Sequence, residues 1–275
     1  MHIFEEPKID CHAHIFDPVA FPYRADTPYR PSGQELGNLA QYYAVMKTYG
    51  VKHALLVQPN SGYAEDNSYI LHAIKTGEGR FKGMAIIDRD ADAATLRKFK
   101  SQGVIGAAIN PTFHGNDYYT NIAGLMKRLA DEDMFFNLQI ERDQFEMFAP
   151  WIRDIPVKVM IDHNARPTVA DGLGQPGFST MLKLADTGRV AVKISGYAKY
   201  ARTPYPFEDC WPYVRAIIAA YTPEHCVWAS DWPFLRAAER QDYGPLVELA
   251  ARFFPNESDR RKLFWDTPKR LFGFA

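Results

Sequence analysis

The sequence has few cysteines and lacks a long apolar run. Three cysteines occur in 275 residues, and none belongs to a CxxC pair. Such a set argues against a disulfide framework and a thiolate zinc cluster, and it favours a reducing compartment. No apolar stretch approaches the roughly 18 residues of a membrane span, and Glu5 and Glu6 stand where a signal peptide needs apolar residues. We therefore expect a soluble cytoplasmic protein.

An excess of charge of one sign is also missing. Lys and Arg total 32 against 33 Asp and Glu, which gives a formal net charge of −1. A near-neutral chain offers no electrostatic reason to expect nucleic acid or an anionic membrane as partner. With 47% hydrophobic residues, the chain has the usual size of one α/β barrel. We expect a single domain, residues 1–275, that acts on a small-molecule substrate; the oligomeric state stays open.

Short apolar or β-branched runs alternate with amphipathic stretches of helical length, the pattern of repeated βα units. The predicted strands are Lys8–His14, His53–Gln58, Gly83–Asp88, Val104–Asn110, Phe135–Ile140, Val157–Asp162, Val190–Gly196 and Cys226–Asp231. The predicted helices are Gln34–Thr48, Asp66–Thr76, Asp92–Ser101, Asp117–Asp131, Asp143–Ile152, Phe178–Thr187, Phe207–Ala220, Gln241–Phe253 and Glu257–Phe272. Eight strands without a solenoid repeat favour a (β/α)8 TIM barrel with additional C-terminal helices, and an open eight-stranded sheet is the alternative.

The first predicted strand carries two histidines that are candidates for a functional site. His12 and His14 lie two residues apart. Side chains alternate between the faces of a strand, so both imidazoles point the same way, and Cys11 between them points to the helix layer. Paired imidazoles are half of a divalent metal site, because neutral histidine nitrogen binds zinc, manganese or iron. A pair of hydrogen-bonded core histidines is the other interpretation.

Polar residues at the ends of two later strands favour the functional interpretation. The sixth predicted strand runs through Asp162 into His163, and the eighth ends at Asp231. In a barrel, the carboxyl ends of all strands meet at one rim, where catalytic residues lie. Three imidazoles and a carboxylate would then converge. We expect four catalytic residues that are also the candidate metal ligands: His12, His14, His163 and Asp231.

Further polar residues at the same rim are candidates for substrate binding. Three amides would close strands two, four and five and suit neutral hydroxyl groups: Gln58, Asn110 and Gln139. Arg166 follows the sixth strand and could bind a substrate carboxylate or an oxyanion, although a surface salt bridge is an alternative. Tyr197 and Lys199 follow the seventh strand. They would line a polar pocket or belong to a solvated loop.

Three ordered motifs carry a resemblance to a known family. They read Ile9-Asp10-Cys11-His12-Ala13-His14, Asp162-His163-Asn164-Ala165-Arg166-Pro167 and Ala229-Ser230-Asp231-Trp232-Pro233-Phe234. Together they resemble the amidohydrolase-2 group of TIM-barrel metal-dependent hydrolases, and within it the branch of sugar lactonases, 4-sulfomuconolactone hydrolase and 2-pyrone-4,6-dicarboxylate lactonase. The resemblance implies hydrolysis of a lactone or related carbonyl compound, with Asp231 as general base and the three imidazoles as metal ligands or carbonyl-polarising donors. A non-oxidative decarboxylase and a barrel that binds without turnover are the alternatives.

Two departures from the family pattern bear on metal and substrate. Members that hold metal tightly often add a ligand from strand five, where this sequence has Gln139, so we expect one zinc or manganese ion that is weakly held or absent. The pyrone-dicarboxylate lactonase carries arginine at the end of strand four, where this sequence reads Gly106-Ala107-Ala108-Ile109-Asn110-Pro111. A charge-assisted arginine–carboxylate contact is worth roughly 1.5–3 kcal/mol. The expected substrate is therefore a neutral lactone or one with a single carboxylate.

Overall fold

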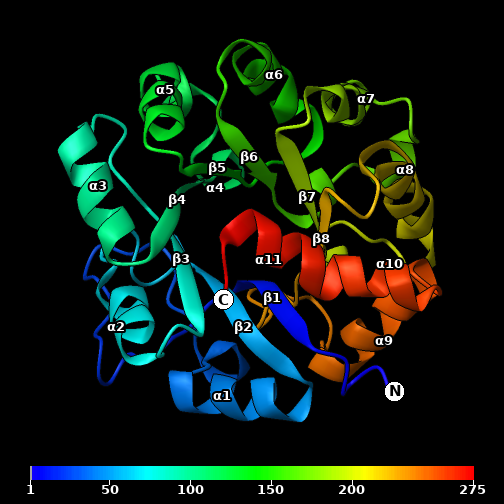
Figure 1. Ribbon diagram of the computed structural model, residues 1–275, viewed down its shortest axis with the longest axis horizontal. Coiled ribbons are helices and arrows are strands. Elements are labelled where there is room, and N and C mark those ends of the chain that lie inside the picture. Colours follow the sequence, from blue (N-terminus) through cyan, green and yellow to red (C-terminus); the bar gives the residue numbers. More distant parts are fainter. Residues whose placement is uncertain (1) are drawn as a thin grey trace.

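Eight parallel strands form the centre of the protein in a computed structural model that describes residues 2–275 (Figure 1). Each strand is hydrogen-bonded to the next along the chain. The strands are β1 (Lys8–Ala13), β2 (Val51–Val57), β3 (Phe81–Ala85), β4 (Val104–Ile109), β5 (Phe135–Leu138), β6 (Lys158–Ile161), β7 (Val190–Ile194) and β8 (Cys226–Trp228). Each overlaps a predicted run, and the differences lie at the strand ends. The predicted (β/α)8 barrel is confirmed.

Helices surround the strands. They are α1 (Leu39–Thr48), α2 (Ser68–Thr76), α3 (Ala93–Ser101), α4 (Pro111–His114), α5 (Ala123–Asp131), α6 (Phe145–Asp154), α7 (Pro176–Lys183), α8 (Trp211–Tyr221), α9 (Tyr243–Phe253), α10 (Glu257–Arg261) and α11 (Thr267–Phe272). Helix α1 begins five residues later than predicted, because Asn38 and Gln41 form a capping box at its start. Within residues 2–275, no helix combines the length and the apolarity needed to cross a membrane.

The C-terminal segment closes one end of the barrel. Helix α11 crosses the barrel opening in Figure 1, and Phe272 and Phe274 pack in an apolar cluster with inward-facing residues such as Ile9 and Met84. The Phe272 ring lies 5.6 Å from that of Phe135, the first residue of β5. The closed end is therefore the amino-terminal end of the strands. The carboxyl end is left for loops and a functional site.

Backbone hydrogen bonds join β1 to the segment that follows β8. The Asp231 N–H donates to the His12 carbonyl at 3.0 Å, and the His14 N–H donates to the Trp232 carbonyl at 2.8 Å. Because these bonds involve the residues next to the side chains of interest, closing the barrel also fixes the relative positions of the first and last strands at the rim.

Candidate active site

A bulge in β1 directs two successive side chains into the barrel. Between Asp10 and Ala13, the pairing with β2 advances three residues on β1 against two on β2. Cys11 therefore packs in the inner apolar cluster, while His12 also faces inward and lies 3.2 Å from Lys193 on β7. The predicted placement of Cys11 against the helix layer is wrong, because the bulge interrupts the alternation of faces.

Three imidazoles and one carboxylate meet at the carboxyl end of the strands. The Nε2 atoms of His12 and His14 lie 3.1 Å apart. Asp231 Oδ1 lies 3.9 Å from each of them and 3.6 Å from His163 Nε2. All four side chains are buried. The structure thus brings the four predicted catalytic residues together around one carboxylate oxygen.

A left-handed turn presents His163. Four consecutive residues, from His163 to Arg166, have φ between 42° and 60°, a conformation that costs roughly 1–2 kcal/mol for each residue other than glycine. Asn164 offsets part of this cost, since its side-chain amide donates to the Ser195 carbonyl at 2.8 Å and to the Tyr200 hydroxyl at 2.9 Å. The turn is thus anchored to the loop after β7.

The same loop orients the His163 ring. Ser195 Oγ lies 3.0 Å from His163 Nδ1, which leaves Nε2 to face Asp231. Gly196 has φ of 66°, and a Cβ atom there would lie 2.6 Å from the His163 ring. The ring therefore occupies space that only glycine leaves open.

Burial controls the charge of the site. It is the largest cause that lowers the pKa of His14 to about 3 and holds the pKa of His163 well below its usual range. His14 Nδ1 donates to the Val57 carbonyl at 2.7 Å, so the neutral ring presents the lone pair of Nε2 to the site. For Asp231, burial alone would raise the pKa, but its pKa lies below the usual range, and the Lys199 ammonium 3.4 Å away is the largest cause that lowers it. At neutral pH, Asp231 is a carboxylate.

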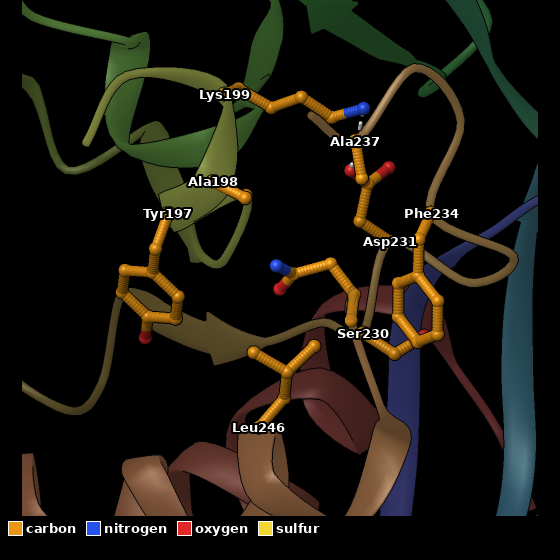
Figure 2. A pocket seen from close by; sticks show the side chains of 10 residues that line it. Tyr197, Ala198, Lys199, Ser230, Asp231, Phe234, Ala237 and Leu246 are labelled. Atoms are coloured by element: carbon orange, nitrogen blue, oxygen red, sulfur yellow. Dashed lines mark ion pairs between the residues drawn. The ribbon is translucent and has the colours of Figure 1, made fainter. Parts of the chain in front are cut away.

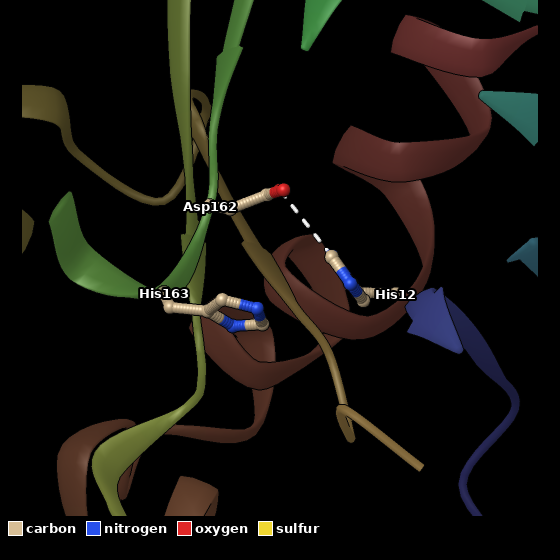
Figure 3. Close-up of side chains that lie close together, drawn as sticks. All are labelled: His12, Asp162 and His163. Atoms are coloured by element: carbon tan, nitrogen blue, oxygen red, sulfur yellow. Dashed lines mark ion pairs between the residues drawn. The ribbon is translucent and has the colours of Figure 1, made fainter. Parts of the chain in front are cut away.

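A buried ion pair lies beneath the imidazoles. Lys193 Nζ lies 2.8 Å from Asp162 Oδ1 and donates to Asn137 Oδ1 at 2.8 Å. Asp162 Oδ1 is also 3.3 Å from His12 Nδ1 (Figure 3). Sequence reasoning missed Lys193 and Asn137. Both could have been recognised from the alternation of side chains along a strand, because each is a polar residue at an inward-facing position of an otherwise apolar strand.

A second buried carboxylate supports Asp231 from outside the barrel. Asp10 accepts hydrogen bonds from the Ser230 backbone at 2.9 Å and the Ser230 hydroxyl at 2.6 Å. The hydroxyls of Tyr42 and Tyr243 donate to it at 2.8 and 2.9 Å. Asp10 thus ties β1 and two surrounding helices to the residue that precedes Asp231 in the chain.

A cavity of about 250 Å³ opens above this cluster. Seven predicted site residues line it: His14, Gln58, Asn110, Gln139, Arg166, Lys199 and Asp231. Tyr197 instead lines a separate cavity of about 20 Å³ beside Asp231 and Lys199 (Figure 2), and its ring stacks on Phe207. The structure therefore separates Tyr197 from the main cavity.

The predicted amides also hold the surrounding loops. The side-chain nitrogen of Gln58 donates to the carbonyls of Ala64 and Asp66 at 2.9 and 2.8 Å, and its Oε1 is buried without a partner among the described residues. Asn110 caps α4 and accepts a hydrogen bond from Gln139 at 3.2 Å. A ligand would have to share these amides with the protein.

Three cationic side chains line the main cavity and differ in their partners. Lys199 Nζ lies 3.4 Å from Asp231 Oδ2. Arg236, which sequence reasoning missed, is exposed, and its guanidinium lies 4.2 Å from the centre of the Tyr29 ring. Arg166 is half-buried, and its Nε has no hydrogen-bond partner within the described part of the chain. Ala108 lines the same cavity and adds no charge.

The chain matches a known protein family over nearly its whole length. The family model described as Amidohydrolase matches residues 9–274. The chain belongs to the amidohydrolase family. It is 30% identical to 4-sulfomuconolactone hydrolase of Rhizobium radiobacter, over 96% of this chain and 89% of that protein. It is 25% identical to 2-pyrone-4,6-dicarboxylate hydrolase of Comamonas testosteroni, over 96% and 89%. A solved structure assigned as a 2-pyrone-4,6-dicarboxylic acid hydrolase from Pseudomonas putida is 28% identical, with a TM-score of 0.85 over 100% and 99% of the two chains.

Two more distant structures share the barrel alone. A zinc-bound amidohydrolase from Burkholderia multivorans is 18% identical, with a TM-score of 0.77 over 98% of this chain and 100% of that one. A 2,6-dihydroxybenzoate decarboxylase from Rhizobium is 14% identical, with a TM-score of 0.65 over 98% and 99%. The decarboxylase alternative therefore rests on the fold only, whereas the curated relatives named above are lactone hydrolases.

This member of the amidohydrolase family has a donor set that fits a divalent ion. His12, His14 and Asp231 each offer one ligand atom, and these atoms lie within 4.8 Å of one another. Two ligands about 2.1 Å from one ion stand roughly 3–4 Å apart, and the separations of 3.1 and 3.9 Å lie in this range. The lone pair of His14 Nε2 already faces the site. A second group of His12, Asp162 and His163 is less suitable, because Lys193 already neutralises Asp162.

Proposed function

We propose that the protein hydrolyses a lactone at Asp231. The observation that carries this proposal is the burial of one carboxylate among three imidazoles, next to a cavity large enough for a small molecule. The relatives named above, which cover nearly the whole chain, are lactone hydrolases. Family and geometry therefore support the same chemistry.

Asp231 is the proposed base. Its pKa lies below the usual range, so it is ionised and can accept a proton. As the oxygen of a water molecule bonds to the acyl carbon, the proton of that water passes to Asp231. When the ring C–O bond breaks, Asp231 returns the proton to the departing alkoxide. The products are one hydroxyl and one carboxylic acid on the opened chain.

The imidazoles are the proposed electrophilic groups. Negative charge develops on the lactone carbonyl oxygen during attack, and a preorganised N–H donor stabilises it in a buried site. The Nε2 atoms of His12 and His163 lie 3.9 and 3.6 Å from Asp231 Oδ1. A role for His14 as donor is disfavoured, since its N–H is used by Val57.

A bound zinc or manganese ion would add Lewis-acid help. His12, His14 and Asp231 are the residues that would hold it, and it would polarise the carbonyl and lower the pKa of a bound water to about 7. Gln139 stands at the end of strand five and donates to Asn110, so it offers no strong ligand. We propose that this site holds metal weakly.

Arg166 is the proposed clamp for a substrate carboxylate. It is half-buried and lines the cavity, and its Nε–H has no partner within the described residues. Lys199, by contrast, is paired with Asp231. Ala108 occupies the place where an arginine is expected. The proposed substrate is thus a lactone with one carboxylate, or a neutral lactone whose hydroxyls meet the amides that line the cavity: Gln58, Asn110 and Gln139.

Hydrolysis in ¹⁸O-labelled water tests the reaction class. The proposal predicts ring opening of a lactone with one ¹⁸O atom in the new carboxylate and no release of carbon dioxide, because water attacks the acyl carbon. Release of carbon dioxide from an aromatic acid, without ring opening of any lactone, would assign the chemistry to decarboxylation instead.

A further inference from the structure

We infer that Lys193 determines which nitrogen of His12 carries the proton, and that this choice favours the hydrogen bond from His12 to His14 over metal binding. The inference rests on the proposed function, which names His12 and His14 among the residues that would hold a metal ion. It adds a positioning residue, Lys193, which does not contact the cavity.

Lys193 can only donate to His12. Its side chain is fully buried in the barrel, and Nζ lies 3.2 Å from His12 Nδ1. An ammonium group has no lone pair to offer, so Nδ1 must supply one. A neutral imidazole that accepts at Nδ1 carries its proton on Nε2. Asn137 and Asp162 hold the ammonium in place at 2.8 Å each.

His14 has the complementary arrangement. Its Nδ1–H donates to the Val57 carbonyl, so Nε2 is an acceptor, and this acceptor lies 3.1 Å from His12 Nε2. Donation therefore runs in one direction, from Lys193 to His12, then to His14 and on to Val57. A metal ion would therefore meet an N–H at His12 Nε2 rather than a lone pair.

Asp162 supports the opposite arrangement. Its Oδ1 lies 3.3 Å from His12 Nδ1 and would accept a proton carried there (Figure 3). His12 and His14 would then direct two lone pairs at each other across 3.1 Å, which suits a metal ion and is unfavourable without one. Lys193 opposes this state, because His12 Nδ1 cannot both accept from Lys193 and donate to Asp162. Metal binding would require the present arrangement to be lost.

Nuclear magnetic resonance of the metal-free wild type tests the inference directly. Long-range ¹H–¹⁵N correlation of protein labelled at histidine distinguishes the two neutral forms of an imidazole, and a His12→Gln variant assigns the signals. We expect His12 to be protonated at Nε2 and His14 at Nδ1. His12 protonated at Nδ1 in the wild type would overturn the inference.

Zinc affinity of variants tests its consequence. In Lys193→Met the competing donor is gone, and zinc should bind at least about tenfold more tightly in competition with a chromophoric chelator, a change typical of groups that orient metal-binding histidines. Lys8→Met is the matched control, because Lys8 is also a fully buried lysine but its ammonium binds the Glu6 carbonyl far from the site. Equal zinc affinities of Lys193→Met and the wild type would overturn the inference.

A double variant separates proton placement from charge and covers the case in which Lys193→Met does not fold. Lys193→Met/Asp162→Asn removes both members of the ion pair and leaves the net charge unchanged. Zinc should again bind at least about tenfold more tightly than to the wild type; wild-type affinity would mean that charge alone matters and would overturn the inference. None of these measurements depends on turnover. The inference can therefore hold for a protein that opens no lactone, and it can be overturned for an active lactonase.

Discussion

Asp231 combines two properties that general bases in hydrolases need. It is ionised, because Lys199 lowers its pKa despite burial. Its backbone is fixed by the hydrogen bond to the His12 carbonyl and by the hydrogen bonds between Asp10 and the preceding residue, Ser230. Its φ of 61° is a strained value for a residue other than glycine. A strained and fully anchored carboxylate among imidazoles fits a catalytic position better than a structural one.

Replacement of this base should remove activity and spare the fold. Asp231→Asn keeps the shape of the side chain and loses its basicity, so kcat should fall at least about 100-fold. Steady-state assays with the best lactone give kcat, and circular dichroism checks the fold. Turnover within a few-fold of the wild type would remove Asp231 from the mechanism.

Removal of the proposed clamp should affect substrates according to their charge. For Arg166→Gln, kcat/KM for a lactone with one carboxylate should fall about 10- to 100-fold, the value of one charge-assisted contact, whereas a neutral lactone should be nearly unaffected. Arg153→Gln is the control, because Arg153 forms a surface ion pair with Asp186. Equal losses of kcat/KM for both lactones would mean that Arg166 supports the fold of the site and does not bind the substrate carboxylate.

The residues of the candidate site were only partly predictable from the sequence. His12, His14, His163 and Asp231 stand out because strand-end positions share a rim in any parallel barrel. Lys193 could have been found by assigning alternate positions of β7 to the interior. Arg236 could not, since its place in the cavity depends on the conformation of a loop.

At the scale of elements, the left-handed turn from His163 to Arg166 and the loop after β7 act as one unit. The turn carries the imidazole and the proposed clamp, and Asn164 and Ser195 bind it to the neighbouring loop. The sequence predicts the strands and most helices, because apolar periodicity and caps are local signals. The bulge in β1 and the left-handed turn depend on contacts between distant segments, which explains why Cys11 was misplaced.

A substitution at Gly196 tests whether the turn and the loop after β7 together position the His163 ring. In Gly196→Ala the added Cβ would lie 2.6 Å from the His163 ring, so the ring must move and kcat should fall at least about tenfold. Gly188→Ala is the matched control, because Gly188 is also in the left-handed region, with φ of 65°, and a Cβ added there would meet no described atom within 4 Å. Both variants should lose roughly 1–2 kcal/mol of stability in denaturant unfolding. Equal activities of the two variants would contradict the role assigned to the glycine.

At the scale of the whole molecule, the barrel is stabilised by contacts of the chain itself at both ends. The C-terminal phenylalanines fill its amino end, and backbone bonds and Asp10 close it at the rim. The loops at the open end supply the cavity and its cations. The apolar closure of the barrel and its chemistry thus lie at opposite ends of the strands, as the barrel architecture leads one to expect.

Removal of the metal should lower the metal content of the protein and leave its thermal stability nearly unchanged. Elemental analysis of purified protein should find less than one zinc or manganese ion per chain, removable by dialysis against a chelator, with a Tm within about 2 °C of that before dialysis, since a weakly bound ion adds little to stability. A stoichiometric ion that survives the chelator would contradict the weak site inferred from Gln139 and Lys193.

The most direct test of the central claim is kcat/KM of the wild type for a panel of lactones, with Asp231→Asn as background. The panel should contain a pyrone dicarboxylate, a muconolactone-type monocarboxylate and several neutral aldonolactones. We predict ring opening well above background, with the monocarboxylate or a neutral lactone preferred to the dicarboxylate. A tenfold preference for the dicarboxylate would contradict the assignment of substrate charge, and a panel in which no lactone opens faster than with Asp231→Asn would contradict the claim itself.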